Sequence, residues 1–104
     1  MQNLKYKEYK EAISSDKCTI IDFWASWCGP CKMIAPNFEK VSEKLSGKCN
    51  FAKVNVDDEE KIAIENHVYS IPTMIIFKGG KEIARRVGYA GESELEDFVN
   101  NNCK

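Results

Sequence analysis

The sequence predicts one α/β domain, residues 1–104, with a central mixed β-sheet flanked by helices on both faces. The first observation is an alternation of short apolar runs, rich in β-branched and aromatic residues, with segments of helical periodicity. The second is the order of these segments, which after a first helix is strand, helix, strand, helix, strand, strand, helix. The third is a length of 104 residues without a repeat or linker, which provides for one hydrophobic core.

The first half of the chain contains the most strongly patterned segments. Residues 5–15 alternate apolar residues with Lys and Glu at helical spacing and predict an amphipathic surface helix. The run 19–25 is almost continuously apolar, which is typical of a strand covered on both faces, so we expect it at the centre of the sheet. A helix should begin at Pro30 and continue to Gly47, and Pro36 should bend this helix rather than end it.

The second half supplies the rest of the sheet and its cover. The predicted elements are a strand at 51–56, a helix from the acidic residues 57–60 to about His67, an antiparallel hairpin of 73–77 and 83–87 across the turn 78–81, and a closing helix at 93–99. His67 is expected to be a solvated turn residue, since no Cys or Asp partner is predicted beside it.

Composition and charge exclude several classes of function. Fifteen Lys and Arg residues against sixteen Asp and Glu residues give a net charge of -1, so no overall positive field favours nucleic acid or an anionic membrane. The N-terminal residues lack the apolar core of a secretory signal, and no apolar run approaches the roughly 20 residues of a membrane helix. The five cysteines form an odd, irregularly spaced set, unlike a secreted disulfide framework. We therefore expect a cytoplasmic protein in a reducing compartment.

Cys28 and Cys31 stand between the predicted central strand and the helix that follows it. At a helix N-terminus, Cys28 would face unpaired backbone N–H groups and the positive end of the helix dipole, which both favour thiolate over thiol. Because the thiolate is the attacking species, Cys28 is the predicted nucleophile. Cys31 lies one helical turn further, close enough to form a disulfide and less exposed, and is the predicted resolving thiol.

Two other interpretations of this CxxC pair are half of a structural zinc site and two small core residues. Zinc requires four ligands, and the other candidate ligands form no second CxxC or HxxxH pair. These candidates are Cys18, Cys49, Cys103 and His67. We therefore predict neither a metal nor another cofactor in this chain.

Three separated motifs occur in order along the chain: Asp22-Phe23-Trp24-Ala25, Trp27-Cys28-Gly29-Pro30-Cys31-Lys32 and Ile71-Pro72-Thr73. With these motifs the sequence resembles the thioredoxin family over nearly its whole length. The resemblance implies a central sheet with four helices and a dithiol that reduces protein disulfides. It also implies that thioredoxin reductase, a flavoprotein that oxidises NADPH, returns the disulfide to the dithiol form.

The resemblance assigns Asp22 to the buried carboxylate that helps move a proton from the resolving thiol, and Lys53 to the basic residue paired with it. The sequence supports the first assignment independently, because an acidic residue inside so apolar a strand is costly to bury in its charged form. The pKa of Asp22 should therefore be raised. The alternative is an Asp at the exposed end of the strand.

The resemblance also implies a groove for an extended substrate segment. Pro72 is expected to follow a cis peptide bond, although most X–Pro bonds are trans, and the backbone of Ile71 should be available to pair with substrate. Gly88 matches the glycine loop that completes the groove. The family more often has a small residue where Tyr89 stands, and this departure could change which partners fit.

The residues around the two cysteines predict a reductant. Trp27, Gly29 and Pro30 would form the rest of an apolar rim, which suits many unfolded or loop segments and implies broad specificity. Neither Gly29 nor Pro30 can become a cation that stabilises the thiolate, so oxidase or isomerase activity is disfavoured. A binding module that uses the same surface without thiol turnover is the alternative from another functional class.

The remaining cysteines are expected to play lesser roles. Cys18 and Cys49 begin strands and are predicted to be small core residues. Cys103 stands next to the chain end, where it should be exposed and could link two copies through a disulfide. Apart from that link we expect a monomer.

Overall fold

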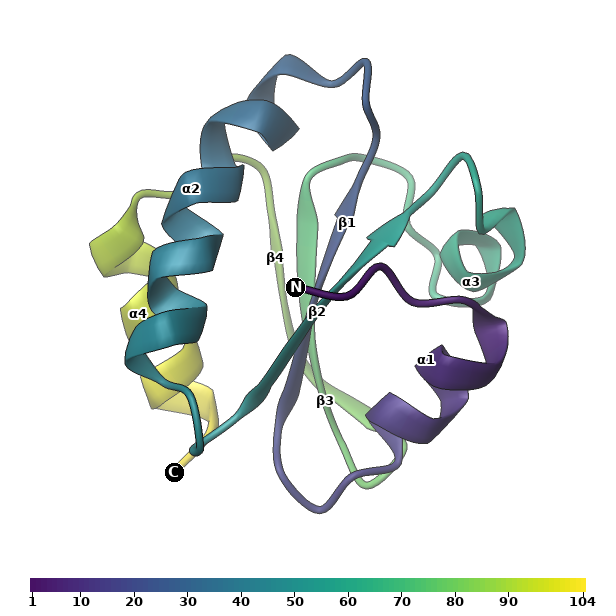
Figure 1. Cartoon of the computed structure of the whole chain (residues 1–104). Coiled ribbons are helices and arrows are strands. Elements are labelled where there is room, and N and C mark those ends of the chain that lie inside the picture. Colours follow the sequence, from purple (N-terminus) through teal and green to yellow (C-terminus); the bar gives the residue numbers. More distant parts are fainter.

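A computed structural model describes all residues, 1–104, and places one four-stranded sheet between two pairs of helices (Figure 1). In chain order the elements are α1 (Tyr6–Ile13), β1 (Thr19–Trp24), α2 (Gly29–Lys44), β2 (Asn50–Asn55), α3 (Glu60–Glu65), β3 (Thr73–Lys78), β4 (Lys81–Val87) and α4 (Glu92–Asn102). Helices α2 and α4 pack side by side on one face of the sheet, and α1 and α3 cover the other. The predicted fold class is confirmed.

The strand order β2-β1-β3-β4 places β1 inside the sheet, as its continuous apolar run predicted. It runs parallel to β2 and antiparallel to β3, which in turn pairs antiparallel with β4. In the β1–β2 ladder Asp22 lies opposite Lys53. The sheet is therefore mixed, and its central strand leads directly into the segment that carries Cys28.

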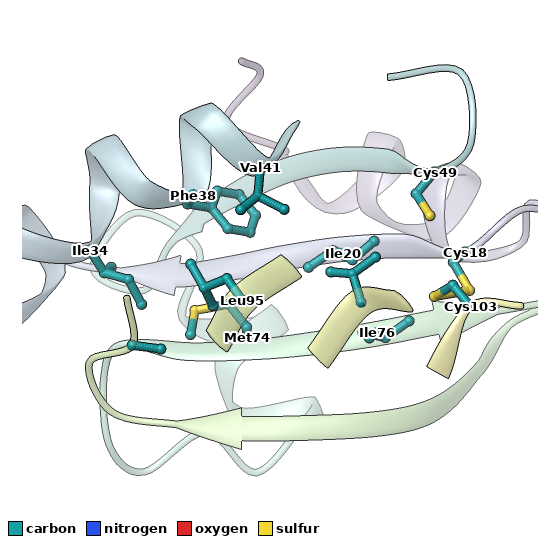
Figure 2. Packing of buried hydrophobic residues seen from close by; sticks show 12 residues of the cluster. Cys18, Ile20, Ile34, Phe38, Val41, Cys49, Met74, Ile76, Leu95 and Cys103 are labelled. Carbon is teal, nitrogen blue, oxygen red and sulfur yellow. A yellow bond between two sulfur atoms is a disulfide. The ribbon is translucent and has the colours of Figure 1, made fainter. Parts of the chain in front are cut away.

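Alternate side chains of the sheet enter two separate halves of the core. Ile20 and Ile76 pack under α2 and α4, in the cluster shown in Figure 2. Ile21 and Ile75 point to the opposite face and pack with residues of α1 and α3. Both faces of β1 are therefore withdrawn from water, which fixes the position of the strand end next to the cysteines.

Helix α2 buries one face at helical spacing. Its buried residues are Cys31, Ile34, Phe38 and Val41. The ring of Phe38 meets that of Phe51 edge to face at 5.7 Å between centroids. The helix continues through Pro36, as predicted, and ends at Lys44, so that Gly47 with its φ of 87° lies in the turn beyond it rather than at its last residue.

Two predicted boundaries differ from the structure by several residues. Helix α3 begins at Glu60 instead of Asp57, because the Asn55 side chain accepts the N–H of Asp57 at 2.9 Å and holds a turn there. Helix α4 extends to Asn102, beyond the predicted end at residue 99. His67 is exposed with a φ of 54°, which agrees with its prediction as a turn residue.

The two edges of the sheet are protected differently. At the β2 edge the N-terminal segment pairs with the strand: Leu4 donates its N–H to the Lys53 carbonyl at 2.8 Å, and Lys53 donates to the Gln2 carbonyl at 2.9 Å. The β4 edge carries four charged side chains. These are Lys81, Glu82, Arg85 and Arg86. No helix of the structure is long and apolar enough to cross a membrane.

Cys18 is buried in the core, as predicted, but the prediction of an exposed Cys103 is wrong. Cys103 is only 6% exposed, and it forms a disulfide with Cys18, with 6.1 Å between the two Cα atoms. The extra turn of α4 explains the difference, because it carries the chain end back over the beginning of β1. The exposed thiol on which a Cys103-linked dimer depended is thus absent from this structure. Cys49 is a free, buried cysteine, as predicted.

Candidate active site

Cys28 and Cys31 form a disulfide at the N-terminus of α2, with their Cα atoms 5.2 Å apart. Cys28 is the N-cap residue: its backbone is extended, and its Sγ accepts the backbone N–H of Cys31 at 3.2 Å. A helix N-terminus leaves backbone N–H groups unpaired and carries a partial positive charge, both of which stabilise an anionic sulfur. The predicted placement of Cys28 at the start of the helix is therefore confirmed.

The expected difference in exposure between the two cysteines is not found. Cys28 is 4% exposed and Cys31 is 3% exposed, so neither side chain is freely accessible in the disulfide state. Part of the cover over Cys28 comes from the segment before β3, where the Ile71 carbonyl oxygen lies 3.8 Å from its Sγ. The sequence could not show this contact, because it joins residues 43 positions apart.

The peptide bond between Ile71 and Pro72 is cis, as the resemblance implied. Gly88 donates its N–H to the Pro72 carbonyl at 2.8 Å and has a φ of 94°, a conformation that glycine adopts most easily. Of the predicted residues, Ile71 therefore contacts Cys28, and Gly88 is bonded to Pro72, the residue after Ile71. Ile71 lies just outside the sheet, since the pairing of β3 with both neighbours begins at Thr73.

Asp22 is fully buried, and neither carboxylate oxygen has a hydrogen-bond partner. It alternates with Ile21 along β1 and so belongs to the face of the sheet that α2 covers. Loss of hydration on burial raises the pKa of Asp22 from 3.8 to about 6, although the positive charge of Lys53 acts in the opposite direction. The predicted rise of this pKa is confirmed, and the alternative of an exposed strand end is excluded.

Lys53 lies opposite Asp22 in the ladder but makes no direct ion pair with it. Its ammonium group instead sits over the ring of Trp24, 4.7 Å from the centroid. The side chain therefore supplies positive charge near Asp22 and leaves the carboxylate unpaired.

The predicted rim residues Trp27, Gly29 and Pro30 are all exposed beside the disulfide, and Trp27 is 69% exposed. The indole N–H of Trp27 donates to a carboxylate oxygen of Asp57 at 2.8 Å. Asp57 was expected only at the start of a helix and was not predicted at this site. The contact could have been expected from the parallel pairing of β1 and β2. Residues that follow the carboxyl ends of two neighbouring parallel strands lie at the same edge of the sheet, and Trp27 and Asp57 follow β1 and β2 in this way.

Tyr89, the position that departs from the family pattern, is half exposed. Asn37 of α2 donates from its amide nitrogen to the Tyr89 hydroxyl at 3.2 Å and to the Ala90 carbonyl at 3.1 Å. These bonds tie the loop after Gly88 to the helix that carries the cysteines. Val87 at the end of β4 and Met33 in α2 add exposed apolar surface, and neither was predicted as a site residue.

Comparisons with known proteins agree with this geometry. The thioredoxin family model matches residues 1–101. The thioredoxin of Malassezia sympodialis is 47% identical over 95 residues, 90% of this chain and 90% of that protein. The chain belongs to the thioredoxin family. A crystal structure of the M. sympodialis thioredoxin superposes with a TM-score of 0.92 at 40% identity, covering 98% of this chain and 90% of that one.

Other members of the thioredoxin family show the same relationship. The thioredoxin of Mycoplasma genitalium is 41% identical over 95 residues, 91% of this chain and 92% of that protein. A bifunctional thioredoxin reductase/thioredoxin of Mycobacterium leprae is 42% identical over 97 residues, which make up 89% of this chain and 21% of that protein. With the Cys28–Cys31 pair in place, this thioredoxin-family chain is a dithiol–disulfide oxidoreductase that acts on protein disulfides.

Proposed function

We propose that Cys28 is the nucleophile and Cys31 the resolving thiol of a protein-disulfide reductase, with Cys28-Gly29-Pro30-Cys31 as its active-site motif. The observation that carries this assignment is the position of Cys28 as the N-cap of α2, where its sulfur already accepts a backbone N–H. This environment favours the thiolate of Cys28 over that of Cys31, which lies inside the first turn.

The reaction proceeds by two exchanges. The Cys28 thiolate attacks one sulfur of a substrate disulfide, forms a mixed disulfide and releases the other substrate sulfur as a thiolate, which takes up a proton. Cys31, after loss of its proton, then attacks the Cys28 sulfur and releases the second substrate thiol. The substrate gains two electrons and two protons, and the chain ends with the Cys28–Cys31 disulfide present in this structure.

Asp22 is the proposed acceptor of the Cys31 proton, directly or through water. A carboxyl group with a pKa of about 6 can take up and return a proton near neutral pH. Lys53 is proposed to keep that pKa from rising further, because its charge favours the carboxylate. Burial without a hydrogen-bond partner suits this role, since no bonded group holds Asp22 in one protonation state.

The substrate segment is proposed to lie along Ile71, whose backbone stands outside the sheet, with Pro72 and Gly88 beside it. Trp27, Gly29 and Pro30 would complete the contact surface. Electrons would return from NADPH through a flavoprotein of the thioredoxin reductase type, and the fusion of both activities in the M. leprae relative supports such a partner. We further propose one domain over residues 1–104, acting as a cytoplasmic monomer.

Replacing Cys31 with Ser is expected to trap the first intermediate. The reduced Cys31→Ser variant should accumulate a covalent complex with a disulfide-containing protein, because no second thiol is left to release the substrate. Non-reducing electrophoresis and peptide mapping would locate the bond at Cys28. Cys28→Ser is the matched control and should give no complex. A complex formed by Cys28→Ser and not by Cys31→Ser would reverse the two assigned roles.

Replacing Pro30 with His is expected to raise the reduction potential of the pair. An imidazolium between the cysteines would stabilise the Cys28 thiolate and with it the reduced form. Pro30→Ala is the control, because it removes the ring without adding a charge. Potentials are measured against graded glutathione buffers with alkylation and mass spectrometry. An unchanged or lower potential in Pro30→His, relative to Pro30→Ala, would refute the idea.

A further inference from the structure

The Cys18–Cys103 disulfide lies at the opposite end of the central strand from Cys28–Cys31. Cys18 directly precedes β1, whereas Cys28 follows its far end. Six strand residues at about 3.3 Å each keep the two pairs roughly 20 Å apart. In Figure 1 the chain end that carries Cys103 accordingly lies far from the beginning of α2. Cys28 therefore cannot reach this second disulfide within the same molecule.

A hollow of about 200 Å³ opens onto this second disulfide. Both Cys18 and Cys103 line it, and the other lining residues are four lysines and one aspartate. They are Lys17, Lys48, Lys78, Lys104 and Asp16. None of the four lysines takes part in an ion pair. Lysines outnumber the single aspartate in this hollow, although the whole chain has a net charge of -1.

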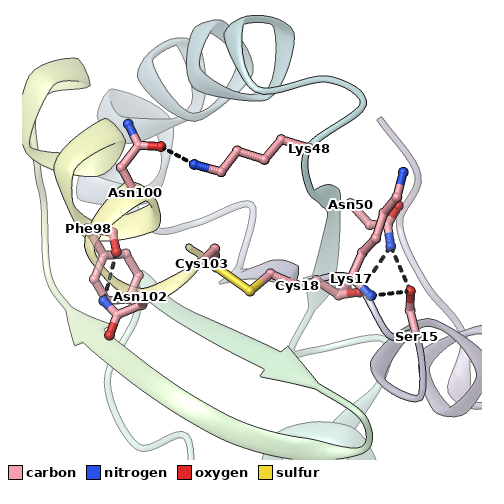
Figure 3. Close-up of a disulfide and its surroundings, with 10 residues drawn as sticks. Ser15, Lys17, Cys18, Lys48, Asn50, Phe98, Asn100, Asn102 and Cys103 are labelled. Atoms are coloured by element: carbon pink, nitrogen blue, oxygen red, sulfur yellow. Dashed lines mark hydrogen bonds between the residues drawn. A yellow bond between two sulfur atoms is a disulfide. The ribbon is translucent and has the colours of Figure 1, made fainter.

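Hydrogen bonds hold two of the lysines beside the disulfide without neutralising them. Lys48 donates to the side-chain oxygen of Asn100 at 2.8 Å, and Lys17 donates to the Gly47 carbonyl at 3.0 Å. Both acceptors are neutral, so the ammonium charges remain available to an incoming ligand. Figure 3 shows Lys48 extending to Asn100, and Lys17 next to Cys18.

We propose that this hollow is a second thiol-exchange site, at which anionic low-molecular-weight thiols of the glutathione class modify Cys103. The ligand's carboxylates meet the lysines, and its thiolate attacks the Cys103 sulfur. The bond from Cys103 to Cys18 breaks, a bond from Cys103 to the ligand forms, and Cys18 leaves as a thiolate that takes up a proton. One disulfide is exchanged for another, so the step needs no external oxidant.

The structure favours Cys103 over Cys18 as the modified residue. The Cys18 carbonyl accepts the N–H of Asn50 at 2.9 Å, which ties Cys18 to the central sheet. Cys103 follows the last turn of α4. Apart from the disulfide, its backbone is hydrogen-bonded only to its own helix, through an N–H donated to the Val99 carbonyl at 2.8 Å. The helix end can therefore move outward with an adduct, whereas the strand cannot.

Cys49 provides a control within the same chain. It belongs to the same core cluster as Cys18 and Cys103 (Figure 2), but the hollow it lines contains no lysine and includes Glu39. Burial also raises the pKa of the Cys49 thiol, against the opposing charges of Lys48 and Lys17. Because Cys49 is a free thiol, a reduced ligand thiol cannot join it without an oxidant, so Cys49 should stay unmodified while Cys103 reacts.

The test uses the full chain with Cys28→Ser and Cys31→Ser, so that only the second site can react. This oxidised variant is mixed with glutathione, with mercaptoethanol, which has no charge apart from its thiolate, or with cysteamine, whose ammonium group offsets its thiolate. The reaction is then quenched with acid and mapped by mass spectrometry. Rates are expressed per thiolate. We expect glutathione to react about tenfold faster than cysteamine, with the adduct on Cys103, and high salt to remove the difference.

A lysine-depleted protein separates a charge effect from simple access to the disulfide. In the same background, the triple change Lys48→Gln, Lys78→Gln and Lys104→Gln should lower the glutathione rate toward the mercaptoethanol rate, and it should lower the mercaptoethanol rate by less because that thiolate carries one negative charge fewer. Equal rates for the three thiols before these changes, or an adduct on Cys18 instead of Cys103, would overturn the proposal. Because the active-site cysteines are absent throughout, the result is independent of the proposed catalytic roles.

Discussion

Replacing Asp22 with Asn should increase the free energy of unfolding at pH 7 by about 3 kcal/mol, because a buried carboxylate would become a neutral amide of nearly the same shape. The pKa of this group rises from 3.8 to about 6 on folding, and the charged form therefore opposes the folded state. The gain would be a large fraction of the total stability of a small domain.

The pH dependence of this gain has a definite sign. Between pH 3.8 and about pH 6 the folded chain holds the Asp22 proton and the unfolded chain releases it. The favourable contribution of the protonated group is complete below the unfolded pKa and is lost as the pH rises through the folded pKa. The advantage of Asp22→Asn should thus be absent below pH 3.8, grow up to about pH 6 and then stay constant.

Denaturant unfolding at a series of pH values measures this effect. Asp58→Asn is the matched control, since the same chemical change at an exposed position should alter stability by less than about 0.5 kcal/mol. An advantage that is independent of pH would mean that the charge of Asp22 is not its source.

The same variant tests the proton-transfer role separately from stability. Without a group that accepts the Cys31 proton, release of the mixed disulfide at pH 7 should slow by roughly 100-fold. Stopped-flow measurement of this step across pH should also lose the inflection near the Asp22 pKa. An unchanged release rate and pH profile would remove Asp22 from the mechanism and leave its effect on stability intact.

Replacing Cys103 with Ser should lower the free energy of unfolding by about 3 to 5 kcal/mol under non-reducing conditions. The Cys18–Cys103 disulfide joins residues 85 positions apart, so it restricts nearly the whole unfolded chain. The disulfide lowers the conformational entropy of the unfolded chain, and the effect is large because the loop is long. The unfolded state thus becomes less favourable, which is the main source of the stabilisation.

Guanidinium unfolding of two proteins isolates this contribution. Both carry Cys28→Ser and Cys31→Ser, and one also carries Cys103→Ser. After treatment with a reductant the two should unfold at nearly the same denaturant concentration, because the cross-link is then absent from both. Equal midpoints without reductant would show that Cys18 and Cys103 are not joined.

Local patterns were sufficient to predict most of the fold. The apolar run that became β1 and the 3,4,3 spacing of buried residues in α2 each depend on neighbours along the chain, so both were found from the sequence. The burial and raised pKa of Asp22 followed from its place in that run. The cis bond before Pro72 came from the family resemblance alone, since spacing carries no information about peptide isomers.

Features that depend on distant segments were not predicted. The bond from Trp27 to Asp57 and the Cys18–Cys103 disulfide both require the folded arrangement of elements that are separate in the sequence. The equal burial of Cys28 and Cys31 likewise depends on the segment at Ile71, which only the tertiary fold brings over the N-terminus of α2.

The protection of the two sheet edges affects how the protein behaves at high concentration. An uncovered edge offers free N–H and C=O groups to a strand of another molecule, which is a common route to aggregation. Here the segment from Gln2 to Leu4 occupies one edge, and on the other the charged residues of β4 oppose close approach of a second copy. Ile71, by contrast, lies in a bend just before β3 and outside this protection. The proposed pairing of a substrate segment beside the cysteines would thus be separate from the two sheet edges, where copies of the chain could otherwise associate.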